Sequence, residues 1–252
     1  MPDPLELIAS LRELIAGSSR IVGFTGAGIS TESGIPDYRS KGGIWNRYQP
    51  VYFADFVADP DKRKLFWERT LELWPAVRDA RPNAGHAFFA ELHRSGKLVG
   101  LVTQNVDGLH EKSGLPQELI VNLHGSALEV VCLSCPCRYS SEEIAAKTDL
   151  ARGIPICAAC GGLLKPDTIS FGQPLRREDL ERADRMARSC DLMIAMGSTL
   201  QVFPAAHIPV TAKRAGAKLA IVTLSETPLD EMADVVVNMP IGELVAVLRG
   251  SP

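Results

Sequence analysis

Short apolar runs rich in valine, leucine and isoleucine recur along the chain and are bounded by turn-forming residues. They lie at residues 21–24, 98–103, 119–123, 191–196, 217–224 and 235–239. Between them, apolar positions spaced as on one face of a helix lie at residues 4–17, 84–94, 177–189, 205–215 and from 241 onward. Continuous apolar runs are typical of parallel strands that are buried on both faces. Their alternation with helices predicts an α/β fold with a doubly wound, parallel, Rossmann-like sheet.

The first helix is bounded by clear start and stop signals. Asp3 is a suitable N-cap residue, Pro4 suits the first helical position, and Gly17 suits the stop. The apolar positions expected to pack on the sheet are Leu5, Ile8, Leu11 and Ile15. Asn83 and Gly96 bound the helix over 84–94 in the same way.

Two insertions interrupt the alternation of strands and helices. Aromatic residues at roughly helical intervals over residues 51–77 predict a helical lid, and these side chains either fill a core or line a pocket. Residues 127–165 carry two CxxC pairs. We therefore expect one domain over 1–252, with a sheet core at about 1–40, 84–126 and 166–252. The smaller module would come from 41–83, which is helical, and 127–165.

Composition excludes several classes of protein. The chain has 252 residues, 46% of them hydrophobic, which is enough for one large core and a small satellite module. A net charge of −3 without a long basic run argues against a general nucleic-acid binder. The first residues do not resemble a signal peptide, and no apolar run reaches membrane-spanning length. Reduced cysteines would suit the cytoplasm, where we place the protein.

The cysteines predict a metal site. Cys132-x-x-Cys135 and Cys157-x-x-Cys160 provide four thiolates, which favours a structural zinc ion with no open position for water. Cys137 could replace Cys135 as a ligand, although the CxxC register favours Cys135. Between the pairs, Ser140 and Glu143 predict a capping box at the start of a helix over 140–147. The remaining cysteine, at position 190, reads as a buried small hydrophobic residue.

The first strand leads into a glycine turn at Gly26-Ala27-Gly28. Glycine permits positive φ and a close approach of the main chain to a pyrophosphate, and the N–H groups of residues 29–31 would face the anion. The spacing departs from the dinucleotide fingerprint, because Thr31 stands where a third glycine is expected. Taken alone, the motif is equally compatible with a plain structural turn.

Polar residues follow the next strands at the same edge of the expected sheet. Gln104 to His110 come directly after the second strand, and His124 follows the third. Asp107 either contacts a ligand or caps the following helix, and His110 is expected to pack. An imidazole titrates near neutrality, so His124 is a candidate general base, although a lone histidine at a strand end is usually structural. The other histidines, His86, His93 and His207, lie in helical patterns without an identifiable partner.

Several motifs together resemble the sirtuins, NAD-dependent protein lysine deacylases. They are GAGISTESGIPDYRS from Gly26, TQNVDGLH from Thr103, the His124-Gly125 pair, the two CxxC pairs, KPDTISFG from Lys165, and the Gly197-Ser198-Thr199 turn. The resemblance covers nearly the whole chain. It implies a deacylase that uses NAD, holds a structural zinc ion and acts on an acylated-lysine protein or peptide.

The resemblance also implies roles for individual residues. It gives catalytic roles to His124 and Asn105. The cofactor-binding residues it implies are Gly26, Ala27, Gly28, Thr31, Asp37, Tyr38, Arg39, Gln104, Asn105, Val106, Asp107, Gly197, Ser198, Thr199, Thr223, Leu224, Ser225 and Ile241. The substrate-binding residues it implies are Ile169, Phe171, Gly172 and Val202. Residues 165–172 are expected to return the chain to the main sheet and to hold the peptide as an added strand.

In the mechanism implied by the resemblance, the acyl oxygen attacks C1′ of the nicotinamide ribose and displaces nicotinamide. His124 then removes a ribose hydroxyl proton, and the products are lysine and O-acyl-ADP-ribose. Tyr38, Asp167 and Thr223 depart from the usual phenylalanine and asparagines of the family. Residues 65–78 hold arginines but no tyrosine, which favours a neutral acyl group, such as acetyl, over succinyl or malonyl.

Two other functions remain open at this stage. The chain could transfer ADP-ribose to protein, or it could be an NAD-binding zinc scaffold without catalysis. The glycine spacing disfavours a dehydrogenase. The sequence assigns neither an oligomeric state nor particular protein substrates.

Overall fold

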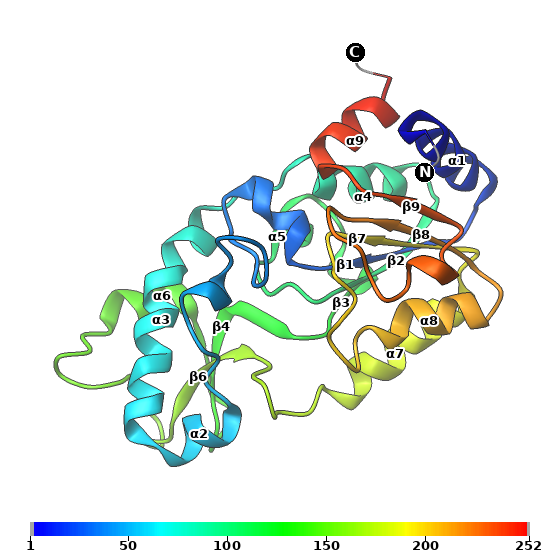
Figure 1. Ribbon diagram of the computed structural model, residues 1–252. Coiled ribbons are helices and arrows are strands. Elements are labelled where there is room, and N and C mark those ends of the chain that lie inside the picture. Colours follow the sequence, from blue (N-terminus) through cyan, green and yellow to red (C-terminus); the bar gives the residue numbers. More distant parts are fainter. Residues whose placement is uncertain (1–2, 251–252) are drawn as a thin grey trace.

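The computed structural model describes residues 3–250, and its main feature is a six-stranded parallel sheet (Figure 1). The strand order is β3-β2-β1-β7-β8-β9. The strands are β1 (Ile21–Thr25), β2 (Leu98–Thr103), β3 (Ile120–Asn122), β7 (Leu192–Met196), β8 (Lys218–Val222) and β9 (Val235–Val237). The predicted doubly wound parallel fold is confirmed. The strands that follow β1 in the chain, β2 and β3, lie on one side of it, and β7, β8 and β9 lie on the other. The carboxyl ends of β1 and β7 are therefore the expected place for a ligand.

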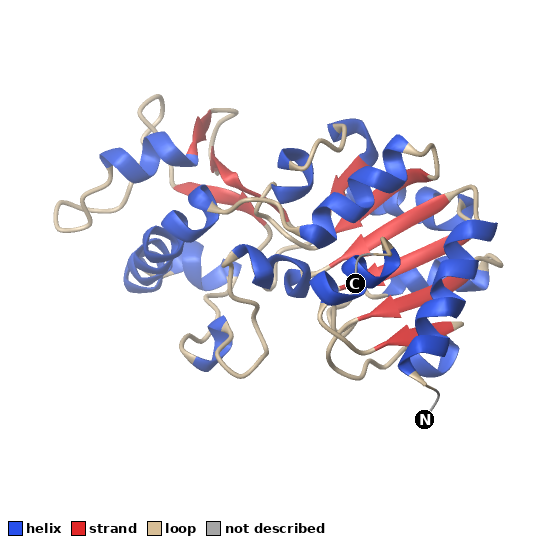
Figure 2. Cartoon of the chain, turned by 90° about the horizontal axis from the view of Figure 1, so that it is seen from above, coloured by secondary structure: helices blue, strands red, loops and turns tan. Residues whose placement is uncertain are grey.

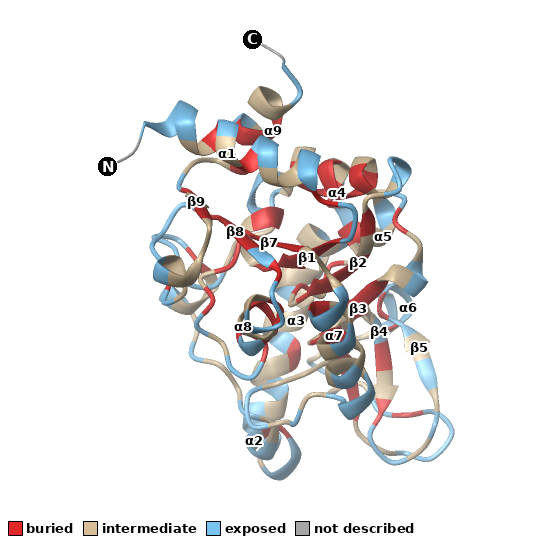
Figure 3. Cartoon of the chain, turned by 90° about the vertical axis from the view of Figure 1, so that its right-hand side faces the viewer, coloured by how far each residue is buried: buried red, intermediate tan, exposed pale blue. Residues whose placement is uncertain are grey.

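Helices cover both faces of this sheet (Figure 3). On one face lie α1 (Pro4–Gly17), α4 (Ala84–Arg94) and α9 (Ile241–Leu248), and on the other lie α7 (Arg177–Ser189) and α8 (His207–Arg214). The side chains of β1 alternate between the two cores: Ile21 packs into the first and Phe24 into the second. No helix within residues 3–250 is both long and apolar enough to cross a membrane.

The first helix forms as predicted at both ends, but its apolar stripe begins later. The Asp3 carboxylate accepts the Leu5 amide, and Ile8 and Leu11 are buried. The Leu5 side chain, however, is 68% exposed, so its predicted packing on the sheet is wrong. At the other end, Lys97 Nζ donates to the carbonyls of residues 15, 16 and 18, which satisfies acceptors left free at the helix C-terminus.

A smaller unit lies beside the main sheet (Figure 2). Its antiparallel sheet has the order β5-β4-β6, with β4 (Gly125–Cys132), β5 (Arg138–Ser140) and β6 (Leu164–Thr168). Two helices replace the single predicted lid: α2 (Phe53–Ala58) and α3 (Pro60–Asp79). They are separate because Asp59 caps α3 and Pro60 occupies its first turn. Phe56 and Trp67 fill the core of this unit with residues of the small sheet.

The small sheet corrects two predictions. β6 pairs with β4 rather than joining the main sheet, so residues 165–168 do not return the chain there. The helix α6 (Ser141–Lys147) is present, but its capping box is absent. Ser140 accepts the Glu142 amide, while Glu143 pairs with Lys147 one turn later. The remaining short elements are α5 (Leu109–Lys112) and 3₁₀ turns at Ala27–Ser33, Ile44–Asn46, Gln117–Leu119 and Asp230–Met232.

Candidate functional site

Two turns meet at the carboxyl ends of β1 and β7. Gly28 N donates to Gly197 O at 2.8 Å, and Gly26 N donates to Met196 O at 3.2 Å. A Cβ at position 28 would lie 2.8 Å from Gly197 O, and one at position 26 would lie 2.8 Å from Ser198 Cβ. Gly26 has φ −133°, and Gly28 is not among the glycines with positive φ either, so neither position uses the positive φ that glycine permits. Glycine is needed because the two turns approach each other so closely.

A cavity of about 1330 Å³ opens over these turns. With the exception of Asp107, every cofactor, catalytic and substrate residue implied by the resemblance lines it. The polar groups that follow strands β1, β2, β3, β7 and β8 therefore line the same cavity. Sequence reasoning missed several further lining residues, among them Glu32, Trp45, Tyr48, Arg69 and Glu226.

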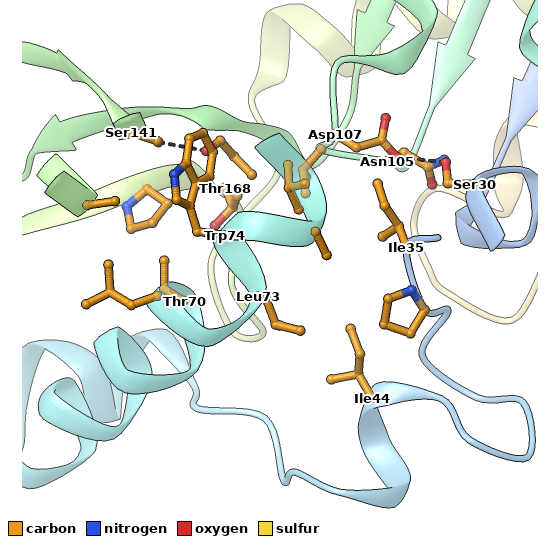
Figure 4. Close-up of a pocket in the computed structure, with 18 of the residues that line it drawn as sticks. Ser30, Ile35, Ile44, Thr70, Leu73, Trp74, Asn105, Asp107, Ser141 and Thr168 are labelled. Carbon is orange, nitrogen blue, oxygen red and sulfur yellow. Dashed lines mark hydrogen bonds between the residues drawn. The ribbon is translucent and has the colours of Figure 1, made fainter. Parts of the chain in front are cut away.

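A smaller cavity of about 210 Å³ adjoins the large one and holds Asp107 in its wall (Figure 4). Ser30, Asn105 and Asp107 lie at one end of it, and Leu73 and Trp74 come from α3. Most of its wall is apolar. Ala27, Tyr38, Asn105 and Val106, among others, line both cavities, so the two cavities are direct neighbours.

Asn105 and Asp107 form the polar floor between the cavities. Asn105 Nδ2 donates to Gly26 O and Ser30 Oγ, each at 3.2 Å. Asp107 Oδ2 accepts from Ser30 Oγ at 2.7 Å, while its Oδ1 accepts the Leu109 amide at 2.9 Å. Asp107 therefore lines the smaller cavity and accepts the first amide of α5, but the N-cap residue of that helix is Gly108, so the predicted N-cap role of Asp107 is wrong. Burial raises the pKa of Asp107, and the hydrogen bonds oppose that shift.

His124 lies between β3 and β4, where the chain passes from the main sheet to the small sheet. Its Nδ1 lies 2.9 Å from Gln104 O. A carbonyl can only accept, so Nδ1 carries the proton and Nε2 keeps its lone pair. Burial lowers the pKa of His124 below 6.5, partly opposed by the hydrogen bond to Gln104. The imidazole is therefore neutral at neutral pH and able to accept a proton.

Two further histidines lie behind the floor. His110 is buried, as expected, and its Nε2 lies 2.9 Å from Thr25 Oγ1. His86 packs against it, and its Nδ1 accepts the Asn83 amide at 3.3 Å. His86 thus has a partner that the sequence did not identify. The signal was the position of His86, three residues after the N-cap of α4.

Aromatic rings form part of the wall of the large cavity. The ring of Trp45 lies 5.5 Å from that of Tyr38 and 5.6 Å from that of Phe171, and Tyr52 lies 6.0 Å from Phe171. Arg39 stacks over the Trp45 ring. These contacts join the loop after β1 to the segment after β6.

The four predicted cysteines come together at the tip of the small sheet. The Sγ atoms of Cys132, Cys135, Cys157 and Cys160 all lie within 4.8 Å of one another, and Cys137 is not part of this group. Tetrahedral zinc with bonds of about 2.3 Å would place its thiolates about 3.8 Å apart. The cluster fits a structural zinc ion, and the Tyr139 hydroxyl, 3.2 Å from Cys157 Sγ, can donate to that thiolate. Cys190 is half-buried, and its thiol donates to Ala187 O.

Known proteins resemble this chain over nearly its full length. A protein of Bradyrhizobium diazoefficiens, named NAD-dependent protein deacetylase 1, is 43% identical and aligns over 97% of this chain and 96% of its own. An NAD-dependent protein deacetylase of Rhodopseudomonas palustris is 42% identical with the same coverage.

Solved structures agree with these relatives. One described as "Structural Basis for the Mechanism and Regulation of Sir2 Enzymes" has a TM-score of 0.87 and 37% identity, covering 98% of this chain and 97% of its own. Another, described as "Sir2-p53 peptide-NAD+", has a TM-score of 0.86 and 33% identity, covering 96% and 97%. The profile of the Sir2 family matches residues 26–204. The resemblance to the sirtuins is thereby confirmed, and the chain belongs to the Sir2 family.

Proposed function

We propose that this chain is an NAD-dependent protein lysine deacetylase, which transfers the acetyl group of an acetyl-lysine side chain to ADP-ribose and releases nicotinamide. The observation that carries the proposal is a neutral imidazole, His124, in the same cavity as the paired glycine turns and Asn105. Relatives that carry this activity in their names align over nearly the whole chain. A related solved structure holds a peptide together with NAD.

The lining residues suit different parts of the dinucleotide. Both turns, at 26–28 and at 197–199, line the large cavity, and we place the pyrophosphate against their main-chain dipoles. Gly26 N, Gly28 N and Gly197 N already donate to main-chain carbonyls, so the other N–H groups of the two turns would face it. Residues 223–225 and Ile241 would border the adenosine. We assign the nicotinamide ring to the smaller cavity, because Ser30, Asn105 and Asp107 offer its carboxamide polar partners beside apolar walls.

When bound, NAD supplies an electrophilic ribose carbon whose bond to nicotinamide breaks as the acyl oxygen attacks. His124 Nε2 accepts the proton of a ribose hydroxyl, and the Gln104 carbonyl holds the ring in the required tautomer. A general base of suitable pKa contributes about 10²–10⁴-fold. Asn105 orients the sugar from the floor.

We propose that the aromatic side chains of the cavity wall exclude water from the site. Tyr38, which is 40% exposed, would be covered when peptide and cofactor fill the cavity. An ordered, dry pocket matters because water at the ribose carbon would only hydrolyse the cofactor.

A neutral acyl group suits the charged side chains of the helical wall. Arg69 donates to Gln49 O and lies over the Tyr48 ring, 4.8 Å from its centre. The Tyr48 hydroxyl donates to Glu72. Arg69 Nη1 is thus engaged by the Gln49 carbonyl rather than free for an acyl carboxylate, so acetyl-lysine should be preferred over succinyl-lysine.

The deciding experiment incubates the protein with NAD and an acetyl-lysine peptide. Wild type and His93→Ala, a control on the outer part of α4, should release nicotinamide and form a product with the mass of O-acetyl-ADP-ribose. His124→Ala should lose about 10²–10⁴-fold of this activity. ADP-ribose attached to protein would support transferase activity instead, and NAD binding without nicotinamide release would support a scaffold.

Cysteine thiolates that hold a metal ion require a reducing compartment. We therefore propose that the protein lies in the cytoplasm.

A further inference from the structure

The segment between β6 and α7 forms one wall of the large cavity. Every residue from Thr168 to Leu175 lines it. From residue 169 onward the segment has no regular structure, so main-chain ladders do not fix its shape. Two main-chain bonds hold it from outside: Ile169 N donates to His124 O at 2.8 Å, and Phe53 N donates to Phe171 O at 2.9 Å. We call residues 168–175 the wall loop.

The residues that flank the wall loop form an ion pair across its base. Asp167 comes immediately before it, in β6, and Arg176 comes immediately after it, as the N-cap residue of α7. Figure 1 shows the segment that joins these two elements. Arg176 Nη2 donates to Asp167 Oδ1. Asp167 Oδ2 accepts from Arg138 Nη2 of β5 at 2.6 Å. Each carboxylate oxygen is thus engaged by a different arginine.

The burial of Asp167 makes these contacts necessary. The residue is only 9% exposed, and an ionised carboxylate at such a position is costly unless it is paired and hydrogen-bonded. Its partners come from different parts of the molecule, since Arg138 belongs to the small sheet and Arg176 begins a helix packed on the main sheet. The pair therefore fixes the two ends of the wall loop relative to each other.

We propose that Asp167 is a positioning residue for peptide binding. Its ion pair with Arg176 closes the base of the wall loop and holds it in the shape that accepts the acetylated peptide. This inference rests on the proposed deacetylase function. Holding a loop in its bound shape lowers the entropic cost of binding, so loss of the pair should weaken peptide binding more than it slows the reaction.

Asp167→Asn and Arg176→Met test the proposal. The KM for an acetyl-lysine peptide should rise about tenfold in each variant, which corresponds to about 1.4 kcal/mol. The kcat and the KM for NAD should change by less than about threefold. Arg176→Lys, which keeps the charge, should recover part of the peptide KM.

The matched control is Arg177→Met. Arg177 is the next residue, its side chain is 91% exposed, and it pairs with Glu181 one turn along the same helix. It should leave the peptide KM unchanged. Hydrogen exchange without ligands provides a readout independent of activity: amides of residues 168–176 should exchange faster in Asp167→Asn and Arg176→Met, with the six-stranded sheet unchanged.

The outcomes separate the two proposals. An inactive wild type would overturn the deacetylase function itself. An active wild type whose peptide KM and loop exchange are unaltered by Arg176→Met would overturn only the role of the ion pair. So would a loss confined to kcat, or an equal effect in Arg177→Met. If Asp167→Asn fails to fold, the two Arg176 variants still decide, because that side chain is 44% exposed.

Discussion

Acidification should destabilise this fold through two buried histidines behind the floor of the large cavity. His86 on α4 and His110 on α5 are 0% and 1% exposed, and their ring centroids lie 4.9 Å apart. His110 contacts Thr25 Oγ1, which donates to Thr103 Oγ1 at 2.8 Å. Thr103 Oγ1 also accepts the Asn105 amide at 3.0 Å. The histidine pair thus supports Asn105, one of the two residues of the polar floor.

The sign and size of the effect follow from the two pKa values. Burial lowers the pKa of His86 from 6.5 to about 4, and burial together with repulsion from His86 lowers the pKa of His110 well below 6.5. Below pH 6.5 the unfolded chain takes up protons at both positions while the folded protein does not, so the free energy of unfolding decreases as the pH decreases. Each group costs about 1.4 kcal/mol per pH unit, so the pair lowers the free energy of unfolding by about 2 to 3 kcal/mol between pH 7.5 and 5.5.

Urea unfolding of wild type and His86→Gln at both pH values tests this reasoning. The variant should lose about 1 kcal/mol less than wild type between pH 7.5 and 5.5, because one titrating group is gone. His93→Gln serves as the control and should behave as wild type. Protonation of the cysteine cluster affects all three proteins alike. The difference in pH dependence between wild type and His86→Gln therefore reports the contribution of the His86 imidazole. Identical pH dependence in wild type and His86→Gln would refute the argument.

Three further predictions concern the site and the cluster. The acid limb of kcat/KM against pH should lie below pH 6.5, because burial lowers the pKa of His124 and the neutral form is the base; a limb above pH 6.5 would contradict this role. Elemental analysis should find one zinc per chain in wild type and Cys137→Ser but none in Cys157→Ser, and equal zinc loss in both variants would place Cys137 among the ligands. Gly28→Ala should weaken NAD binding, measured by calorimetry, by about tenfold or more, since a Cβ 2.8 Å from Gly197 O forces the two turns apart at a cost of about 1–3 kcal/mol; wild-type affinity would show that the turns have room to move.

Local signals were enough to predict most elements of the main sheet. β2, α4 and α7 begin and end at the predicted residues, because apolar runs, caps and turn residues act over a few positions. The assignment of β6 to the main sheet failed for the opposite reason. Its five residues, LKPDT, carry little periodicity, and its sheet is decided by pairing with β4, which lies far away in sequence.

The candidate site could be predicted as a place but not as a set of contacts. The carboxyl ends of parallel strands meet at one edge, which is why Gly26, Asn105 and His124 line one cavity. The reason for glycine at position 28 was not predictable, since the constraint is the turn at Gly197. The ion pair across the base of the wall loop escaped prediction for a related reason: a pattern in sequence does not show which charges are buried together.

The position of His124 explains why a zinc ion outside both cavities should matter for catalysis. His124 directly precedes β4, and its carbonyl holds the first residue after β6 through Ile169 N. Gly125, with φ 77°, packs so closely on this segment that a Cβ would lie 1.9 Å from Asp167 O. β4 and β6 are paired up to Cys132, the first ligand of the cluster. Loss of the metal would therefore loosen the pairing of these two strands, and His124, the base that we propose, would lose its position without any change in its chemistry.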